Sequence, residues 1–144
     1  MSNAAFATTL HIRDNCLCLH TQRAARTLAR RFDEAFRPFG ITSGQFSLLN
    51  GLNRPEPPTI GAVADLLAMD RSTVTANLKP LERAGLVVSS VDQKDRRGRR
   101  IGLTDQGRAL LQQAWPIWIS EHGRLEDELE GRGDALREGL RAVA

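Results

Sequence analysis

At 144 residues the chain has room for one well-packed domain and too little for two of ordinary size. Its 41% hydrophobic and 26% charged residues are typical of a globular protein and exclude a disordered or fibrous chain. No stretch approaches the roughly 20 apolar residues of a membrane span, and the first residues do not resemble a secretion signal. We therefore expect a cytoplasmic protein without a membrane partner.

The net charge of +3 is unevenly distributed along the chain. Residues 92–100 hold five basic and two acidic residues, so this segment carries the whole excess and the rest of the chain is neutral. Residues 121–138 hold seven acidic residues against three arginines. We therefore expect a molecule with a basic tip suited to a polyanion and an acidic end that a polyanion repels.

The first third of the chain is predicted to form two helices. Apolar and small residues recur at three- and four-residue spacing over 15–37, which indicates one helix with a buried stripe. A proline and a glycine directly after it end this helix. Thr42 and Gln45 form a capping-box pattern at the start of the second helix. The residues that this second helix turns inward are Phe46, Leu49 and Leu52.

Two short helices joined by a tight turn follow a proline-rich loop over 54–58. Thr59 is expected to cap the first helix and Asp70 the second, and this arrangement is typical of a helix-turn-helix. The second helix turns one apolar side inward and leaves a small, polar side with a cation near each end, which suits the major groove of DNA. Its serine and threonines are expected to reach base edges, and its cations to engage phosphates. These candidate contacts are Arg71, Ser72, Thr73, Thr75 and Lys79.

A β-hairpin with a basic tip comes next. Residues 86–91 and 99–103 are predicted to be its strands, and 92–98 its loop. Arginines on a narrow hairpin tip can enter the minor groove of DNA. Most charge runs are solvated turns, but here the whole charge excess lies on a hairpin beside a helix-turn-helix, which favours a DNA-binding wing. Its candidate contacts are Lys94, Arg96, Arg97 and Arg99.

Two helices complete the chain. Thr104 is expected to cap a long helix that runs to about Leu129, and Gly131 and Gly133 end it before a short last helix over 136–143. Together with the helix over 15–37, these helices carry more apolar surface than a small winged helix needs. An exposed apolar stripe requires a partner, so we expect a dimer. The alternative is that the helices cover the core of their own chain.

Three motifs in the second half have a characteristic order. They are LERAGLV over Leu81 to Val87, DQKDRRG over Asp92 to Gly98, and IGLTDQG over Ile101 to Gly107. They resemble the MarR family of winged helix-turn-helix regulators over nearly the whole chain in element order. The resemblance implies a mainly α fold with a small β-hairpin wing (α+β), in a single domain over 6–144. Within it, the winged helix-turn-helix covers about 42–104 and the dimerisation helices about 12–38 and 105–143.

The resemblance also implies a function. It indicates a sequence-specific regulator of transcription, usually a ligand-responsive repressor, that binds double-stranded DNA as a homodimer. Such a dimer reads a pseudo-palindromic operator with half-sites about 10 bp apart. Arg97 is then the groove-inserting arginine, braced by Asp95. Many relatives carry a basic residue at the position of Ala76, so the base preference of this chain is expected to differ.

The family resemblance further implies release by a small molecule, often an aromatic acid or phenol. This effector would bind between the dimerisation helices and the winged domain. Trp115 and Trp118 either lie near it or belong to the core.

Two cysteines leave a redox mode of regulation open. Cys18 falls on the reactive cysteine of the peroxide-sensing, OhrR-like branch of the family, and thiolates at helix N-termini are readily oxidised to sulfenic acid. That branch supports its cysteine with tyrosines, whereas Phe32 and Ser43 stand at two of these positions here. This loss favours Cys16 and Cys18 as small apolar residues of a dimer-forming helix. Their spacing makes a mutual disulfide unexpected.

Other chemistry finds little support in the sequence. It contains no nucleophile motif, no phosphate-binding glycine loop and no histidine or cysteine cluster at metal-ligand spacing. We therefore expect no catalytic residues, no metal, no cofactor and no enzymatic activity. Two rival classes are an architectural DNA-binding protein without sequence preference and a thiol peroxidase that uses Cys18.

Overall fold

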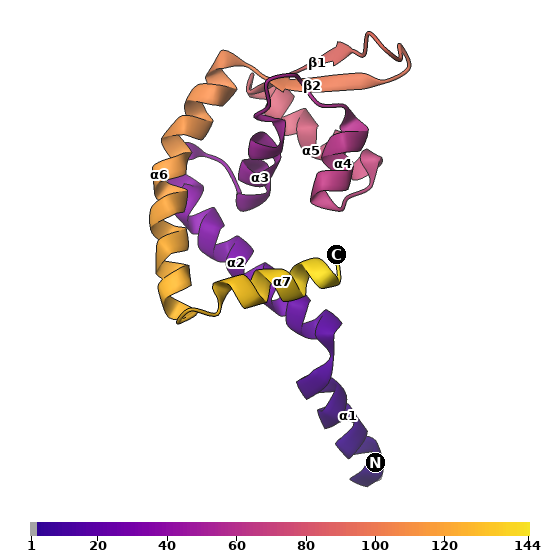
Figure 1. Cartoon of the computed structure of the whole chain (residues 1–144), viewed down its shortest axis with the longest axis vertical. Coiled ribbons are helices and arrows are strands. Elements are labelled where there is room, and N and C mark those ends of the chain that lie inside the picture. Colours follow the sequence, from indigo (N-terminus) through magenta and orange to yellow (C-terminus); the bar gives the residue numbers. More distant parts are fainter. Residues whose placement is uncertain (1–2) are drawn as a thin grey trace.

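The computed structural model describes residues 3–144 and shows the predicted helical fold with a hairpin wing (Figure 1). The strands β1 and β2 pair in antiparallel register, with Val87 opposite Leu103. Within the described part of the chain, no helix is both long and apolar enough to cross a membrane. In chain order, the elements are α1 (Asn3–Asn15), α2 (Leu17–Phe36), the 3-10 turn η1 (Arg37–Phe39), α3 (Ser43–Leu52), α4 (Ile60–Leu67), α5 (Arg71–Arg83), β1 (Val87–Val91), β2 (Arg99–Leu103), α6 (Asp105–Glu128) and α7 (Gly133–Ala142).

The core lies where α3, α4, α5 and the hairpin meet α2 and α6. Val74, Leu78 and Leu81 of α5 are at most 2% exposed, which confirms the side of this helix that was expected to face inward. Phe36 of α2 stacks on Phe46 of α3 with ring centroids 4.4 Å apart. Each such buried side chain stabilises the fold by about 1.5–3 kcal/mol. The core therefore joins α5 and the hairpin, the two elements that were predicted to contact DNA.

Threonine caps begin three of the helices, as predicted. Thr42 and Gln45 form a complete capping box at α3, with both reciprocal hydrogen bonds present. Thr59 accepts a backbone N–H in the first turn of α4, and Thr104 does the same for α6. Each cap satisfies a donor that the first turn leaves unpaired, so the helix starts are well defined by the sequence.

The predicted cap of α5 by the side chain of Asp70 is wrong. Asp70 occupies the N-cap position with an extended backbone, but its side chain makes no capping hydrogen bond. Backbone geometry holds the preceding turn instead: Ala68 adopts a left-handed conformation with φ +52°, and the Met69 N–H donates to the Ala64 carbonyl. The start of α5 is therefore set by the α4–α5 turn.

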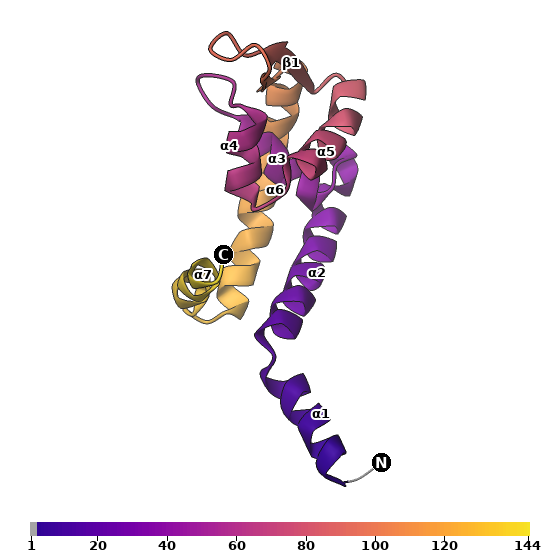
Figure 2. The same ribbon diagram turned by 90° about the vertical axis from the view of Figure 1, so that its right-hand side faces the viewer.

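The helix predicted over 15–37 is interrupted near its start. The chain forms α1, breaks at Cys16 and continues as α2. Cys16 is the N-cap residue of α2, where its Sγ accepts the Leu19 N–H at 3.4 Å. Sequence periodicity missed α1 because this helix has no apolar stripe, and none of its thirteen described residues is buried. Figure 2 shows α1 extending away from the body of the molecule.

The other boundaries differ in detail. β1 begins at Val87, one residue later than predicted. In β2, Ile101, Gly102 and Leu103 are all buried, because Pro57 covers the glycine that alternation would leave exposed. α6 ends at Glu128, and residues 130–131 form the turn with positive φ angles. The second glycine predicted to break the helix, at 133, instead begins α7.

α7 stands away from the rest of the chain. Only Gly133 of its ten residues is buried, so this helix does not cover the core of its own chain. In Figure 2, α7 lies apart from α2. An apolar groove of about 700 Å³, the α2–α7 groove, lies between them. Its walls include Leu17 and Ala24 of α2 and Leu136, Leu140 and Val143 of α7.

Candidate nucleic-acid interface

The residues predicted to contact DNA lie on α5 and the hairpin, and all nine are exposed. Within residues 3–144, the side chains of Arg71, Ser72, Thr73 and Lys79 make no hydrogen bond or ion pair. Their donors are therefore available to a ligand. Thr75 differs, because its hydroxyl donates to the Arg71 carbonyl at 2.9 Å. In this conformation Thr75 offers DNA an accepting oxygen and a methyl group.

Arg71 lies back across the first turn of α4. Its Nη2 is 2.8 Å from the position that a Cβ atom on Gly61 would take. Only a residue without a side chain leaves this space for the guanidinium. Gly61 is the second residue of α4, where the helix dipole and the unpaired N–H groups favour anions. Arg71 and the start of α4 therefore form one positive region suited to a DNA phosphate.

A hollow of about 190 Å³ lies between α5 and the hairpin. Thr75, Lys79 and Glu82 line it from α5, and Ser89 and Arg99 line it from the two strands. The Arg99 Nη2 donates to Ser89 Oγ at 2.6 Å, which holds the guanidinium along the hairpin. Three of the predicted contact residues thus share one hollow, and helix and wing form a continuous surface.

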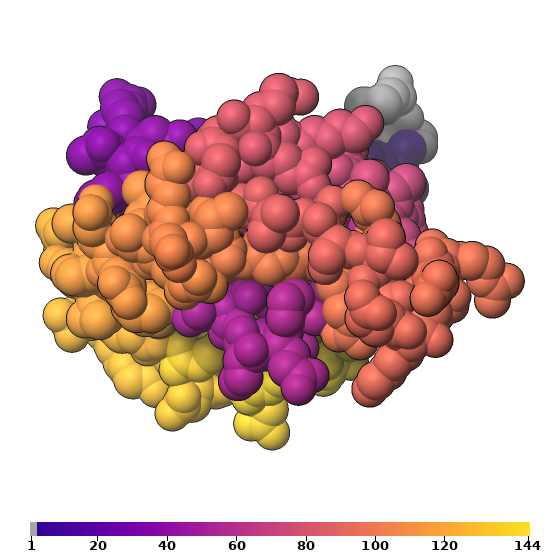
Figure 3. All heavy atoms as spheres, turned by 90° about the horizontal axis from the view of Figure 1, so that it is seen from above, coloured from indigo at the N-terminus to yellow at the C-terminus, as the bar shows by residue number. Residues whose placement is uncertain are grey.

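The tip of the wing, residues 92–98, carries a cation that lies almost wholly in solvent. The Arg97 side chain is 94% exposed, and its Nε lies 3.4 Å from Asp95 Oδ1. The same carboxylate oxygen accepts the Arg97 backbone N–H at 3.1 Å, as the predicted bracing role requires. Lys94 and Arg96 are also exposed. Figure 3 shows the wing projecting from one edge of the molecule, where it can reach into a groove.

Beneath this tip lies an ion pair that sequence reasoning missed. Asp92 is 7% exposed and is the one buried charged residue among those described. Its Oδ1 accepts the Lys94 N–H at 3.1 Å and the Arg100 Nε at 3.0 Å, and these two bonds hold the pKa of Asp92 below its usual value. The sequence did hold a signal for this ion pair, because positions 92 and 100 lie diagonally across the predicted hairpin, where long side chains can reach each other.

A second hollow, of about 470 Å³, lies between α3, α4 and α6. Leu66, Leu67 and Trp118 form much of its apolar wall. Trp118 stacks on His122 with ring centroids 4.5 Å apart. Trp115 is partly buried, and its Nε1 donates to Asn50 Oδ1 at 3.1 Å; Asn50 also lines the hollow. Of the two tryptophans, Trp118 borders the space and Trp115 supports its wall.

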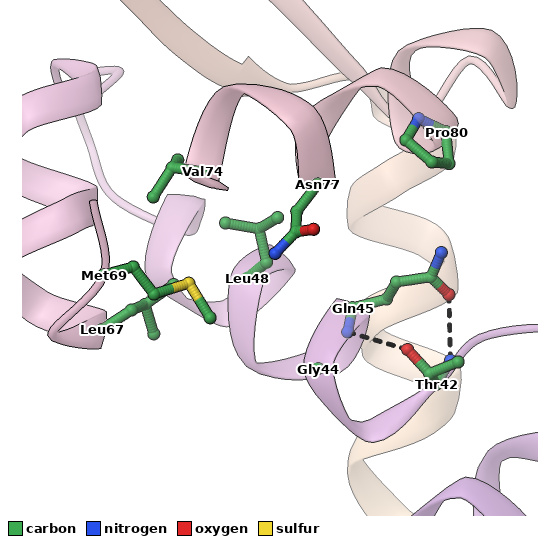
Figure 4. A pocket seen from close by; sticks show the side chains of 9 residues that line it. All are labelled: Thr42, Gly44, Gln45, Leu48, Leu67, Met69, Val74, Asn77 and Pro80. Carbon is green, nitrogen blue, oxygen red and sulfur yellow. Dashed lines mark hydrogen bonds between the residues drawn. The ribbon is translucent and has the colours of Figure 1, made fainter. Parts of the chain in front are cut away.

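A smaller hollow, of about 230 Å³, lies between α3 and α5 (Figure 4). Leu48 of α3, Met69 of the turn and Val74 of α5 supply apolar walls, and the Asn77 amide adds a polar group. The capping box of α3 borders the same space. Helix α5 therefore has unfilled space on a side that faces the protein.

Both cysteines are free thiols in the structure. Cys18 is exposed, and its Sγ accepts a hydrogen bond from the Gln22 Nε2 at 3.2 Å. Phe32 is buried among Phe36 and His122, and the Ser43 N–H bonds Asp33. Within residues 3–144, no group of three or more histidine, cysteine or acidic side chains is placed to hold a metal ion.

Comparison with known proteins identifies the family. The profile of the MarR family matches residues 39–98. The chain is 35% identical to the transcriptional regulator MosR of Mycobacterium tuberculosis, in a crystal structure with DNA. That alignment covers 90% of this chain and 93% of MosR, with a TM-score of 0.77. The chain belongs to the MarR family.

Two other relatives extend the comparison. The repressor CouR, bound to a 23-mer DNA duplex, is 30% identical to this MarR-family chain over 92% of it and 94% of CouR, with a TM-score of 0.78. CouR from Rhodococcus jostii has also been solved with p-coumaroyl-CoA; there the identity is 26%, the coverage 90% of each chain and the TM-score 0.72. The regulator SarZ of Staphylococcus aureus is 26% identical over 94 residues, which span 65% of this chain and 64% of SarZ.

Proposed function

We propose that this MarR-family chain is a sequence-specific DNA-binding regulator of transcription, acting as a ligand-responsive repressor. The observation that carries the proposal is the continuous exposed surface of α5 and the wing. This surface holds uncommitted donors on Arg71, Ser72 and Thr73, and it includes most of the basic segment 92–100, whose charges sum to the +3 of the chain. Base-reading donors beside phosphate-binding cations are what sequence-specific recognition needs. The DNA complexes of MosR and CouR support the same role.

We further propose a homodimer and a division of labour within a single domain over 6–144. Residues 42–104 would read DNA, and the helices over 12–38 and 105–143 would dimerise. The α2–α7 groove supports this, because its apolar walls remain open in the single chain. Leu17 is 73% exposed, and Leu136 and Leu140 are 47% and 42% exposed. A two-fold dimer then reads a pseudo-palindrome with half-sites about 10 bp apart.

For the releasing signal we propose a small aromatic or phenolic effector in the hollow beside Trp118. The hollow lies between the DNA-reading helices and α6, so a ligand there contacts both parts of the chain. Its largely apolar wall suits an aromatic ring. CouR, which binds p-coumaroyl-CoA, supports this class of ligand. Quenching of tryptophan fluorescence by added phenolic acids tests the proposal, with Trp118→Phe as the control.

Footprinting on genomic fragments selected for binding tests the main proposal. A regulator that works on the chromosome, in the cytoplasm, protects one pseudo-palindrome at physiological salt. An architectural protein instead covers DNA uniformly, with an affinity set by salt alone. Uniform protection would reject the proposed function. We propose no enzymatic activity, and catalytic turnover of peroxide by the chain would overturn that.

Regulation through Cys18 is the second candidate, favoured by the Gln22 amide at its Sγ; Cys18 is exposed in the single chain and lines the α2–α7 groove. Under this alternative, peroxide oxidises the thiol once to a sulfenic acid and releases the operator. Titration of the DNA complex with peroxide, for the wild type and for Cys18→Ser, distinguishes the two signals. Release of both proteins by a phenolic acid, and of neither by peroxide, would reject the redox route.

A further inference from the structure

One arginine of the basic segment faces the protein instead of solvent. The Arg100 side chain is 27% exposed, against 94% for Arg97. Its Nε donates to Asp92 Oδ1 at 3.0 Å, and its Nη1 donates to the carbonyl oxygen of Pro57 at 2.7 Å. The two acceptors belong to different parts of the chain: Asp92 begins the wing tip, and Pro57 lies in the proline-rich loop before α4.

The carboxylate that Arg100 binds holds the wing tip in shape. Besides Arg100, Asp92 Oδ1 accepts the Lys94 N–H, and the Asp92 N–H donates to the Gly98 carbonyl at 3.0 Å. Arg100 and Asp92 lie diagonally across the hairpin, so their ion pair joins the tip to strand β2. A buried carboxylate with these partners is costly to leave unpaired, which makes the geometry specific.

The loop that Arg100 reaches is joined to the same strand by its backbone. The Ile101 N–H donates to the Pro58 carbonyl at 3.0 Å, and Thr59 pairs with Arg100 as an isolated antiparallel bridge. Thr59 is also the N-cap of α4. The hairpin is therefore attached at its edge to the first helix of the helix-turn-helix, and Arg100 supplies the side-chain contact at this junction.

We propose that Arg100 is a positioning residue for DNA binding. It fixes the wing to the helix-turn-helix in the orientation that brings Arg97 to the minor groove, and it makes no DNA contact of its own. Its guanidinium is committed to Asp92 and Pro57, whereas those of Arg96 and Arg97 lie in solvent. The inference rests on the proposed DNA-binding function and concerns how the wing is held during binding.

Two substitutions distinguish a positioning role of Arg100 from a contribution of its charge alone. Arg100→Lys keeps the charge but cannot bind both acceptors with a planar fork. Asp92→Asn adds one net positive charge to the wing and weakens the ion pair. If the charge of the segment alone matters, the first variant binds the operator like wild type and the second binds more tightly. If Arg100 positions the wing, both bind more weakly, by about tenfold if the competent orientation falls to about a tenth of molecules.

Three further readouts complete the test. Arg97→Ala should cost less operator affinity in the Arg100→Lys background than in the wild type. The slope of log affinity against log salt should become shallower for Arg100→Lys, because Arg97 then no longer enters the minor groove and displaces no counterions there, although the charge of the wing is unchanged. Hydroxyl-radical footprints should lose the flanking minor-groove protection and keep the major-groove protection. Amide exchange at Ile101, measured without DNA, should become faster.

The outcomes divide clearly. Wild-type affinity for Arg100→Lys together with tighter binding by Asp92→Asn would overturn the positioning role. Faster amide exchange at Ile101 in Arg100→Lys, together with an Arg97→Ala loss of affinity that is as large in this background as in the wild type, would also overturn it. The ion pair would then contribute to stability alone. Thermal unfolding of each variant checks that the fold is intact, and Arg124→Lys, the same exchange at an exposed position of α6 outside the wing, is the matched control. If the wild type itself protects no operator, the proposed function fails, which is a separate result.

Discussion

Arg97 and Arg100 are three residues apart and have opposite surroundings. Arg97 lies in solvent with its backbone and Nε tied to Asp95, whereas Arg100 is held between Asp92 and the proline-rich loop. A count of charge treats the two side chains as equal. Their hydrogen bonds separate a side chain that is available to DNA from one that is engaged within the protein.

Replacement of Arg97 is the most direct test of the wing. We expect Arg97→Ala to weaken operator binding by about 1–3 kcal/mol, because a groove-inserting guanidinium is lost. Titration by fluorescence anisotropy at fixed salt measures this. Arg13→Ala removes the same charge from α1, far from the wing, and should leave the affinity unchanged. Equal affinity for Arg97→Ala and wild type would show that Arg97 does not enter a groove of the operator.

Gly61 is expected to act on DNA through Arg71. A methyl group on Gly61 would displace the Arg71 guanidinium, which is the far end of a flexible side chain, so the fold should tolerate it. We expect Gly61→Ala to weaken operator binding while thermal stability rises slightly, by up to about 1 kcal/mol. In an Arg71→Ala background the same change should have no further effect on DNA affinity. Additive losses in that double-mutant cycle would contradict the mechanism.

At the scale of elements, strong local signals were predictable and long-range contacts were not. The periodic apolar residues of α5 and the threonine caps of α3, α4 and α6 depend on neighbours within one or two turns, and the structure bears them out. α1 has no such pattern and was missed. The all-buried stretch in β2 depends on Pro57, which is more than 40 positions away in sequence. A pattern read from neighbouring residues cannot predict that contact.

The junction between the hairpin and α6 should be sensitive to added volume. A Cβ on Gly107 would lie 2.1 Å from the Leu86 backbone oxygen, which cannot easily move. We expect Gly107→Ala to lower the free energy of unfolding by about 1–3 kcal/mol. Gly123→Ala in the same helix meets nothing within 4 Å and should leave stability unchanged or raise it by up to about 1 kcal/mol. Urea unfolding of both variants makes the comparison, and equal effects would refute it.

Acid should loosen the contact between α2 and α6. Arg31 donates to Glu121 at 2.6 Å and to both oxygens of Glu128, and these bonds lower the pKa of Glu128. A carboxyl with a lowered pKa in the folded state stabilises above its unfolded pKa of about 4.3, and that contribution disappears as pH falls through the folded value. Glu128→Gln should therefore be less stable than wild type at about pH 7, with the gap closing near about pH 3. The gap should be small, because the Glu128 side chain is 60% exposed. A constant gap across that range would contradict this.

The whole molecule is predicted to require a second copy. Leu140→Glu would place a carboxylate in the α2–α7 groove, where burial of an unpaired charge costs several kcal/mol. We expect the dimer dissociation constant to rise by at least about a hundredfold, with operator binding lost in parallel. Analytical ultracentrifugation measures the first and anisotropy the second. Arg141→Glu introduces the same residue on α7 outside the groove and serves as the control. A Leu140→Glu variant that stays dimeric would exclude this groove as the interface.

The candidate site was predictable in outline for a physical reason. DNA-facing residues must be exposed and polar, so Arg71 to Lys79 and the arginines of the wing stand out in sequence against a buried apolar background. The contacts that hold these residues in place are tertiary, and they do not stand out in the sequence. The place of Arg71 over Gly61, and the junction of Arg100 with Pro57, join segments that no sequence period connects.

The separation of charge has a kinetic consequence. The basic wing lies at the top of the molecule in Figure 1, and the acidic stretch over 121–138 lies well below it, at the far end of α6 and in α7. In the field of a polyanion such a molecule experiences a torque that turns its wing forward before contact. The protein is then already oriented when it meets DNA, before any base is read. Added salt should therefore slow association far more than it speeds dissociation.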